Sequence, residues 1–238
     1  MTSIPALELT AGLRSGNSTA PRLTWYGPDS ERVELSGRVL DNWVAKTSNL
    51  LQDELDAEPG MRLRLALPAH WKALVWALAG WQLGLETVLD DGQADFLATD
   101  DPAGSDGQYD AVVAVALPAL AMRWGGDLPA GCLDYAAEVR SHGDVFMPHA
   151  DPDPSSRAVL TSQGRSVLHQ DLITGFAVPH TEGARLHVPA DAGLEAVLAN
   201  ALGAWHQGGS VVLTHPDVAL TDKLMADERI HGSWQPPA

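Results

Sequence analysis

The sequence predicts an α/β protein in which helices cover a largely parallel β-sheet in layers. The run AVVAVALP at 111–118 is apolar without interruption, which is typical of a strand covered on both faces. The segment HWKALVWALAGWQLG at 70–84 is apolar nearly all round, which is typical of a deeply buried helix. Strands and helices alternate from residue 157 onward, and this order favours parallel pairing of the strands.

The first half of the chain is expected to open with two strands joined by the turn GPDS, after a flexible loop at 12–20. Ser36 can cap the helix that follows, because apolar residues repeat at helical spacing from Val39 to Leu55. The tryptophans at 43, 71, 76 and 81 fall in predicted helices and are expected to pack in the core. The strands predicted for this half lie at 22–26, 31–35, 62–68, 86–89 and 95–98.

The second half begins with a short helix near 132–141 and a loop at 148–156. A strand at 157–161 is expected to lead through a loop into a helix that includes Val167, Leu168 and Leu172. Further strands are predicted at 185–189 and 210–215, and further helices at 194–205 and 218–228. We expect one domain over residues 1–238, with the loop at 148–156 as its internal seam.

Composition excludes several classes of function. The 238 residues carry a formal net charge of −16, and no cluster of Lys and Arg offsets it, so nucleic-acid and membrane partners are not expected. The N-terminal stretch lacks the pattern of a signal peptide, and the longest apolar run is too short to span a membrane. We therefore expect a cytoplasmic protein. Cys132 has no second cysteine to pair with and is expected to be buried and inert.

Polar clusters elsewhere give weaker signals. The segment SHGDVFMPHADPD contains histidines and carboxylates, but their spacing matches no metal-binding motif, and we interpret it as a solvated loop. Four histidines lie near predicted strand ends, where ligands bind in parallel sheets, although a structural role is the more common one. They are His169, His180, His187 and His215. No G-x-S-x-G nucleophile motif occurs, so no catalytic residue and no metal ligand is assigned.

Several motifs follow one another in a recognisable order. The first set comprises Glu34-Leu35, Gly60, Leu65, Leu67-Pro68, Trp81 and Gly84, and it is followed by AVLTSQG, HQDL and LEAVLANALGAWHQGGSVVL. This order resembles the N-terminal domain of the adenylate-forming superfamily, which includes the acyl-CoA synthetases. Because the resemblance covers nearly all of the chain but only the front part of a typical member, the chain looks like a truncated, degenerate relative from a family of short bacterial proteins.

The resemblance implies a site for a nucleotide phosphate. Members of the superfamily activate a carboxylate with ATP, and they hold phosphate in a T-S-G-T-T-G-x-P-K-G loop, for which AVLTSQG stands here. The implied phosphate contacts are Thr161, Ser162, Gly164, Arg165 and Ser166, with ATP or AMP as the implied ligand. The loop is about six residues shorter than in the superfamily and has lost its Gly-Thr repeat and its lysine. The superfamily's later motifs, including the C-terminal domain with its catalytic lysine, have no counterpart in the sequence, and no metal ligand is identified, so we expect no adenylation by this chain alone.

Three hypotheses follow. In the first, the chain is a binding or interaction module without adenylation activity, and it forms a homodimer or a complex with another protein. In the second, it is the nucleotide- or acyl-binding half of an adenylate-forming enzyme, completed in trans by a partner. In the third, only the α/β architecture is shared and the ligand is unrelated. The order of the strands in the sheet, together with whether residues 161–166 form a concave cradle or a closed tight turn, discriminates between the first and the third hypothesis.

Overall fold

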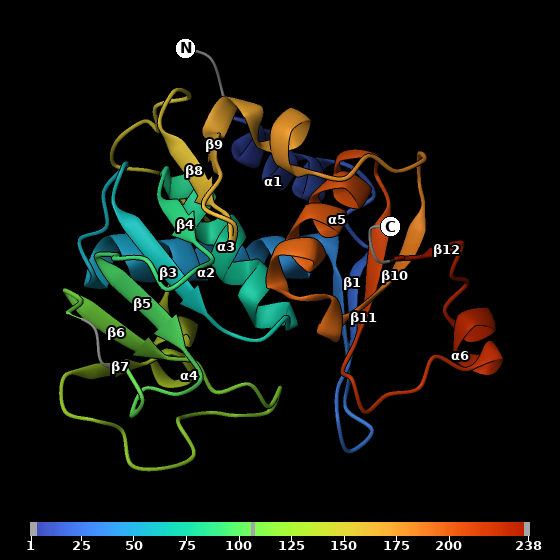
Figure 1. Ribbon diagram of the computed structural model, residues 1–238, viewed down its shortest axis with the longest axis horizontal. Helices are drawn as coiled ribbons and strands as arrows, with labels where there is room; N and C mark the ends of the chain where they lie inside the picture. Colours follow the sequence, from blue (N-terminus) through green and yellow to red (C-terminus); the bar gives the residue numbers. More distant parts are fainter. Residues whose placement is uncertain (1–3, 106–107, 236–238) are drawn as a thin grey trace.

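The computed structural model describes residues 4–105 and 108–235. It contains two β-sheets that face each other across a layer of helices (Figure 1). Except for the pairs β1–β2 and β8–β9, the neighbouring strands of both sheets run parallel. The predicted α/β class with largely parallel pairing is therefore confirmed, but the strands form two sheets where the sequence suggested one.

The first sheet joins the two ends of the chain. Its strand order is β12-β10-β11-β1-β2. The N-terminal hairpin lies beside β11, and Trp25 stands in register with Leu213. The strands are β1 (Pro21–Tyr26), β2 (Arg32–Ser36), β10 (Arg185–Pro189), β11 (Ser210–Thr214) and β12 (Gly232–Ser233).

The second sheet has the order β7-β6-β5-β3-β4-β8-β9. Strand β8 pairs with β4, so strand pairing in this sheet crosses the loop at 148–156, as it does in the first sheet between β1 and β11. The strands are β3 (Arg62–Ala66), β4 (Glu86–Val88), β5 (Phe96–Thr99), β6 (Ala111–Ala114), β7 (Cys132–Asp134), β8 (Arg157–Leu160) and β9 (Ser166–Leu168).

Helix α3 is the centre of the core. Every residue of α3 (Trp71–Leu83) is buried, as its apolar surface predicts, and it contacts both sheets through β1, β3 and β4. Trp71, Trp76 and Trp81 are buried, and Trp43 packs its ring 5.3 Å from that of Trp71. The other helices are α1 (Pro5–Ser15), α2 (Gly37–Glu54), α4 (Tyr135–Glu138), α5 (Leu194–His206) and α6 (Asp222–Asp227).

Some local predictions were wrong. The segment 12–20, expected as a loop, begins inside α1, whose buried Ala6, Leu9 and Leu13 supply a helical stripe that packs on α2. Val167 and Leu168, expected in a helix, lie in β9, which turns back antiparallel on β8, and helical structure begins only at His169, as a 3₁₀ turn to Asp171 and a π-helix at Leu172–Phe176. The region 132–141 opens with strand β7 before the short helix α4.

Ser36 caps α2 as expected, accepting a hydrogen bond from the Val39 amide at 3.3 Å. In the described ranges, no helix combines the length and the apolar character needed to cross a membrane.

Candidate functional site

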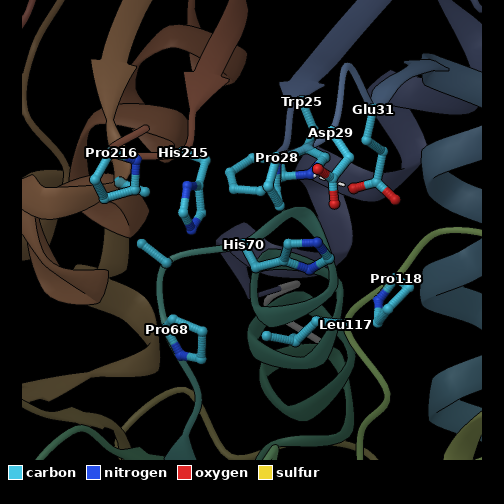
Figure 2. A pocket seen from close by; sticks show the side chains of 12 residues that line it. Trp25, Pro28, Asp29, Glu31, Pro68, His70, Leu117, Pro118, His215 and Pro216 are labelled. Atoms are coloured by element: carbon cyan, nitrogen blue, oxygen red, sulfur yellow. Dashed lines mark hydrogen bonds between the residues drawn. The ribbon is translucent and has the colours of Figure 1, made fainter. Parts of the chain in front are cut away.

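Strands of both sheets end at one cleft. The residues that follow the carboxyl ends of β1, β3, β6, β10 and β11 line a cavity of about 380 Å³, hereafter the apolar cavity (Figure 2). Its apolar walls are formed by Trp25, Pro28, Pro68, Leu117, Ala190 and Pro216, and its polar groups belong to Asp29, Glu31, His70 and His215. Ligands bind at this edge of parallel sheets, so the apolar cavity is a candidate site.

Glu31 fixes two walls of the apolar cavity. One of its carboxylate oxygens accepts from the Trp25 indole N–H at 2.8 Å, and the other accepts from the Ala119 amide at 2.7 Å. Lys72 holds the same loop from the other side, donating from Nζ to the Ala116 and Pro118 carbonyls. Because Lys72 is buried, its pKa falls to about 8. The segment 116–119 is therefore held between a carboxylate and an ammonium group.

His70 begins α3. Its Nδ1 accepts from the Lys72 amide at 3.2 Å, which caps the helix, and its ring meets the Trp25 ring edge-on at 4.7 Å. Burial, with Lys72 and His215 nearby, lowers the pKa of His70 to about 3. At neutral pH the ring is therefore uncharged, and with Nδ1 acting as acceptor its proton lies on Nε2.

His215 and His70 line the same cavity, and in Figure 2 Pro28 lies between them at about the height of His215, with Pro68 and Leu117 below. The Nδ1 atom of His215 lies 3.2 Å from the Asp217 amide, from which it accepts a hydrogen bond. Its ring is 6.2 Å from that of Trp25. The cleft thus brings together two imidazoles that are far apart in the sequence.

A second cavity, of about 620 Å³, adjoins the first and shares Pro68 with it. We refer to it as the acidic cavity, because its carboxylates are Asp90, Asp91, Asp100 and Glu195. Arg64 lines it, but its guanidinium is bound to the Asp91 carboxylate and donates to the Tyr109 hydroxyl at 2.8 Å. Burial raises the pKa of Asp100. The field in this cavity disfavours anions.

The predicted phosphate loop lies beside the acidic cavity and is a closed turn. The Thr161 amide donates to the Arg165 carbonyl at 2.9 Å, and the Gly164 amide donates back to the Thr161 carbonyl at 2.9 Å. The Arg165 amide donates to the Thr161 hydroxyl at 3.1 Å. Gly164 has φ of 75°, a left-handed conformation that glycine adopts without strain. Ser166 already belongs to β9 and pairs with Leu160.

Ser162 and Arg165 also donate to partners within the chain. Ser162 donates from its amide at 2.9 Å and from its hydroxyl at 2.5 Å to the same oxygen of Glu195, in the first turn of α5. Arg165 directs its guanidinium to the Gly175 carbonyl at 2.8 Å. A carboxylate of the chain itself therefore occupies the donors that a phosphate would need.

The other histidines predicted near strand ends lie outside the apolar cavity. His169 is fully buried and its pKa falls to about 4, chiefly through burial. His180 hydrogen-bonds the Asn200 amide oxygen at 3.0 Å, and His187 hydrogen-bonds the Thr214 hydroxyl at 3.0 Å. Sequence reasoning missed His70, although its position directly after the β3 strand and Pro68 is the same signal that pointed to His215.

The segment around His142 and His149 packs along α2. Lys46 pairs with the Asp144 carboxylate at 2.8 Å, and the Gln52 side-chain oxygen accepts from the His149 amide at 2.9 Å. Within residues 4–105 and 108–235, no three His, Cys, Asp or Glu side chains gather so that they could hold a metal ion. Cys132 is a free, half-buried thiol on β7.

Comparisons with known proteins agree with this geometry. No family model matches the chain. An acyl-CoA synthetase from Brucella canis superimposes with a TM-score of 0.75 at 15% identity, over 97% of this chain and 46% of that one. The anthranilate CoA ligase AuaEII, in complex with anthranoyl-AMP, gives 0.67 at 16% identity, over 87% and 44%. The N-terminal domain of FACL13 from Mycobacterium tuberculosis gives 0.68 at 14% identity, over 97% and 62%.

These similarities establish the fold, which is that of the N-terminal domain of acyl-CoA synthetases. The chain spans about half the length of the first two of these proteins. A curated relative from Mycobacterium tuberculosis (strain ATCC 25618 / H37Rv), described as a TIGR03089 family protein, is 34% identical over 221 residues. The alignment covers 88% of this chain and 89% of that protein. On this similarity along nearly the whole of both proteins, the chain belongs to the TIGR03089 family.

Proposed function

We propose that this chain is a ligand-binding module with a degenerate phosphate loop and does not itself form acyl-adenylates. The observation that carries the proposal is the closed turn at 161–166, where Glu195 occupies the Ser162 donors. Adenylation requires donors that are free to meet the phosphates of ATP and the charge that develops on them. Here the amides of Thr161, Ser162, Gly164 and Arg165 all have partners within the chain.

Electrostatics support the same conclusion. Of the described residues lining the acidic cavity, Arg64 is the one cation, and it is paired with Asp91. A triphosphate entering this cavity would meet carboxylates, in a chain whose formal net charge is −16. Its phosphates would therefore lose hydration without gaining charged partners.

Two assays test the proposal. Calorimetry with Mg·ATP should detect no binding, and ATP–pyrophosphate exchange with a panel of aromatic and fatty acids should show no turnover above a buffer control. Exchange catalysed by the purified chain would overturn the proposal. Exchange that appears only when a second protein is added would favour the hypothesis of completion in trans, and Arg165→Ala should then weaken ATP binding.

We also propose that the chain forms a homodimer in the cytoplasm. Two loops carry large apolar side chains that are exposed to solvent. Leu120 is 91% exposed and Met147 is 76% exposed, and Met122 and Val145 are exposed beside them in the sequence. Exposed apolar groups of this size favour association. Light scattering on a sizing column should give twice the 25.3 kDa chain mass. A monomer at about 100 µM, which is about a hundredfold above a micromolar Kd, would contradict the dimer.

A further inference from the structure

We propose that the apolar cavity binds an uncharged one- or two-ring molecule whose acceptor oxygen, such as that of a carboxamide, is hydrogen-bonded by His70 and His215. The inference rests on the proposed function as a binding module and names its ligand class. It depends on three properties of the cavity, which are its size, its free donors and its charge.

The size of the cavity fits one or two rings. Its volume is about 380 Å³, and an apolar cavity of about 150 Å³ is enough to hold benzene. The lining residues are mostly proline, leucine and alanine, and Trp25 adds an aromatic ring to them. Flat apolar surfaces of this kind favour rings over flexible polar chains, because burying a ring costs little conformational entropy.

Two donors in the cavity have no acceptor among the residues that the structure describes. The Nδ1 atoms of His70 and His215 are occupied by the amides of Lys72 and Asp217. Within the described residues, neither Nε2 atom forms a hydrogen bond. Neither atom is fully buried, so each keeps some accessible surface. Both Nε2–H groups are therefore reachable from the cavity. Because Nδ1 of each ring acts as acceptor in the neutral form, Nε2 carries the proton and needs an acceptor atom.

Charge then selects an uncharged ligand. Among the described residues that line the cavity there is no lysine or arginine, and the nearby Lys72 directs its ammonium to the Ala116 and Pro118 carbonyls. A carboxylate placed here would be buried without a cation and close to Asp29 and Glu31. An ammonium group only donates hydrogen bonds, so it would leave the Nε2–H groups of His70 and His215 without an acceptor, and it could pair only with Asp29 and with the Glu31 carboxylate, which already accepts from Trp25 and Ala119. A neutral acceptor avoids both penalties.

The experiment compares matched probes that differ only in charge. Cinnamamide, cinnamate and cinnamylamine share one skeleton, as do benzamide, benzoate and benzylamine, and each set is titrated into the full chain by protein-observed NMR without nucleotide. We expect the carboxamides to bind with a millimolar or lower Kd, and to bind at least about tenfold more tightly than their charged counterparts. If no carboxamide binds, or if a carboxylate or an amine binds as well as its carboxamide, the proposal is wrong.

Variants place the binding in this cavity. His215→Phe keeps the ring and removes the donor at a half-exposed position, and it should weaken carboxamide binding about three- to tenfold. Ala190→Phe should block the cavity and abolish binding. His206→Phe is the matched control, because His206 is exposed at the end of α5 and outside the cavity, and it should leave binding unchanged. Unchanged binding in Ala190→Phe would overturn the site.

The two proposals fail in different ways. ATP–pyrophosphate exchange with these probes would overturn the proposed lack of adenylation but would leave the binding data intact. Absence of probe binding would overturn the ligand class while leaving the lack of adenylation standing.

Discussion

Acid should destabilise this protein through His70, and His70→Asn should remove that part of the pH dependence. The pKa of His70 falls from 6.5 to about 3 on folding, because burial between Trp25 and α3 penalises the charged ring. Between pH 6.5 and about pH 3, His70 is therefore protonated in the unfolded chain and uncharged in the folded chain. Stability is thus unaffected above pH 6.5 and falls as pH decreases toward 3.

The size of the effect follows from the two pKa values. Between pH 7 and pH 5, the proton that only the unfolded state binds at His70 lowers the free energy of unfolding by about 2 kcal/mol. His169, whose pKa falls to about 4, contributes a further loss of about 2 kcal/mol over the same range. Between pH 7 and pH 5, the free energy of unfolding of the wild-type chain should therefore fall by about 4 kcal/mol through these two rings, and that of His70→Asn by about half as much.

Urea denaturation followed by tryptophan fluorescence at pH 7, 6 and 5 measures these values. Asn can still accept the Lys72 amide and cap α3, so the variant isolates the ring. Its stability at pH 7 can fall through lost packing, and the prediction concerns only the slope with pH. His206→Asn, at an exposed position, should keep the wild-type slope. An unchanged slope in His70→Asn would refute the assignment.

Three further substitutions test other parts of the structure by denaturant unfolding. Glu195→Ala removes the acceptor of both Ser162 donors and should lower the free energy of unfolding by about 1 kcal/mol, because the pair is partly exposed. The Ser162 amide should also exchange its hydrogen faster, and an unchanged exchange rate would argue against the contact. Gly203→Ala would place a Cβ 1.7 Å from the Val178 carbonyl oxygen and should cost about 3 kcal/mol, whereas Gly12→Ala on α1 meets nothing within 4 Å and should not destabilise. The pKa of Lys72 falls from 10.5 to about 8 on folding, so the unfolded state binds an extra proton, and the free energy of unfolding of the wild type should rise by about 1.5 kcal/mol between pH 8 and 9.5. Lys72→Met should abolish this rise, and the same rise in both proteins would contradict the buried lysine.

The sequence by itself predicted the features that depend on local pattern. The all-round apolar surface of 71–83 predicted the central helix, and the apolar strand runs predicted parallel pairing, because burial on every face requires apolar residues at every position. The order of short motifs predicted the fold of the acyl-CoA synthetase N-terminal domain, which the structural comparisons confirm. The sequence also shows that the segment 161–166, which we propose to be a degenerate phosphate loop, contains no lysine.

Tertiary structure decided what the candidate site contains. Residues 166–168 carry a pattern that suits a helix, and they became β9 because Gly164 allows a tight turn and β8 offers an edge for pairing. The contacts of Glu195 with Ser162 and of His70 and His215 with the apolar cavity join residues that are distant in the sequence. Such contacts depend on the register of β1 with β11 and of β4 with β8, and no local pattern encodes that register.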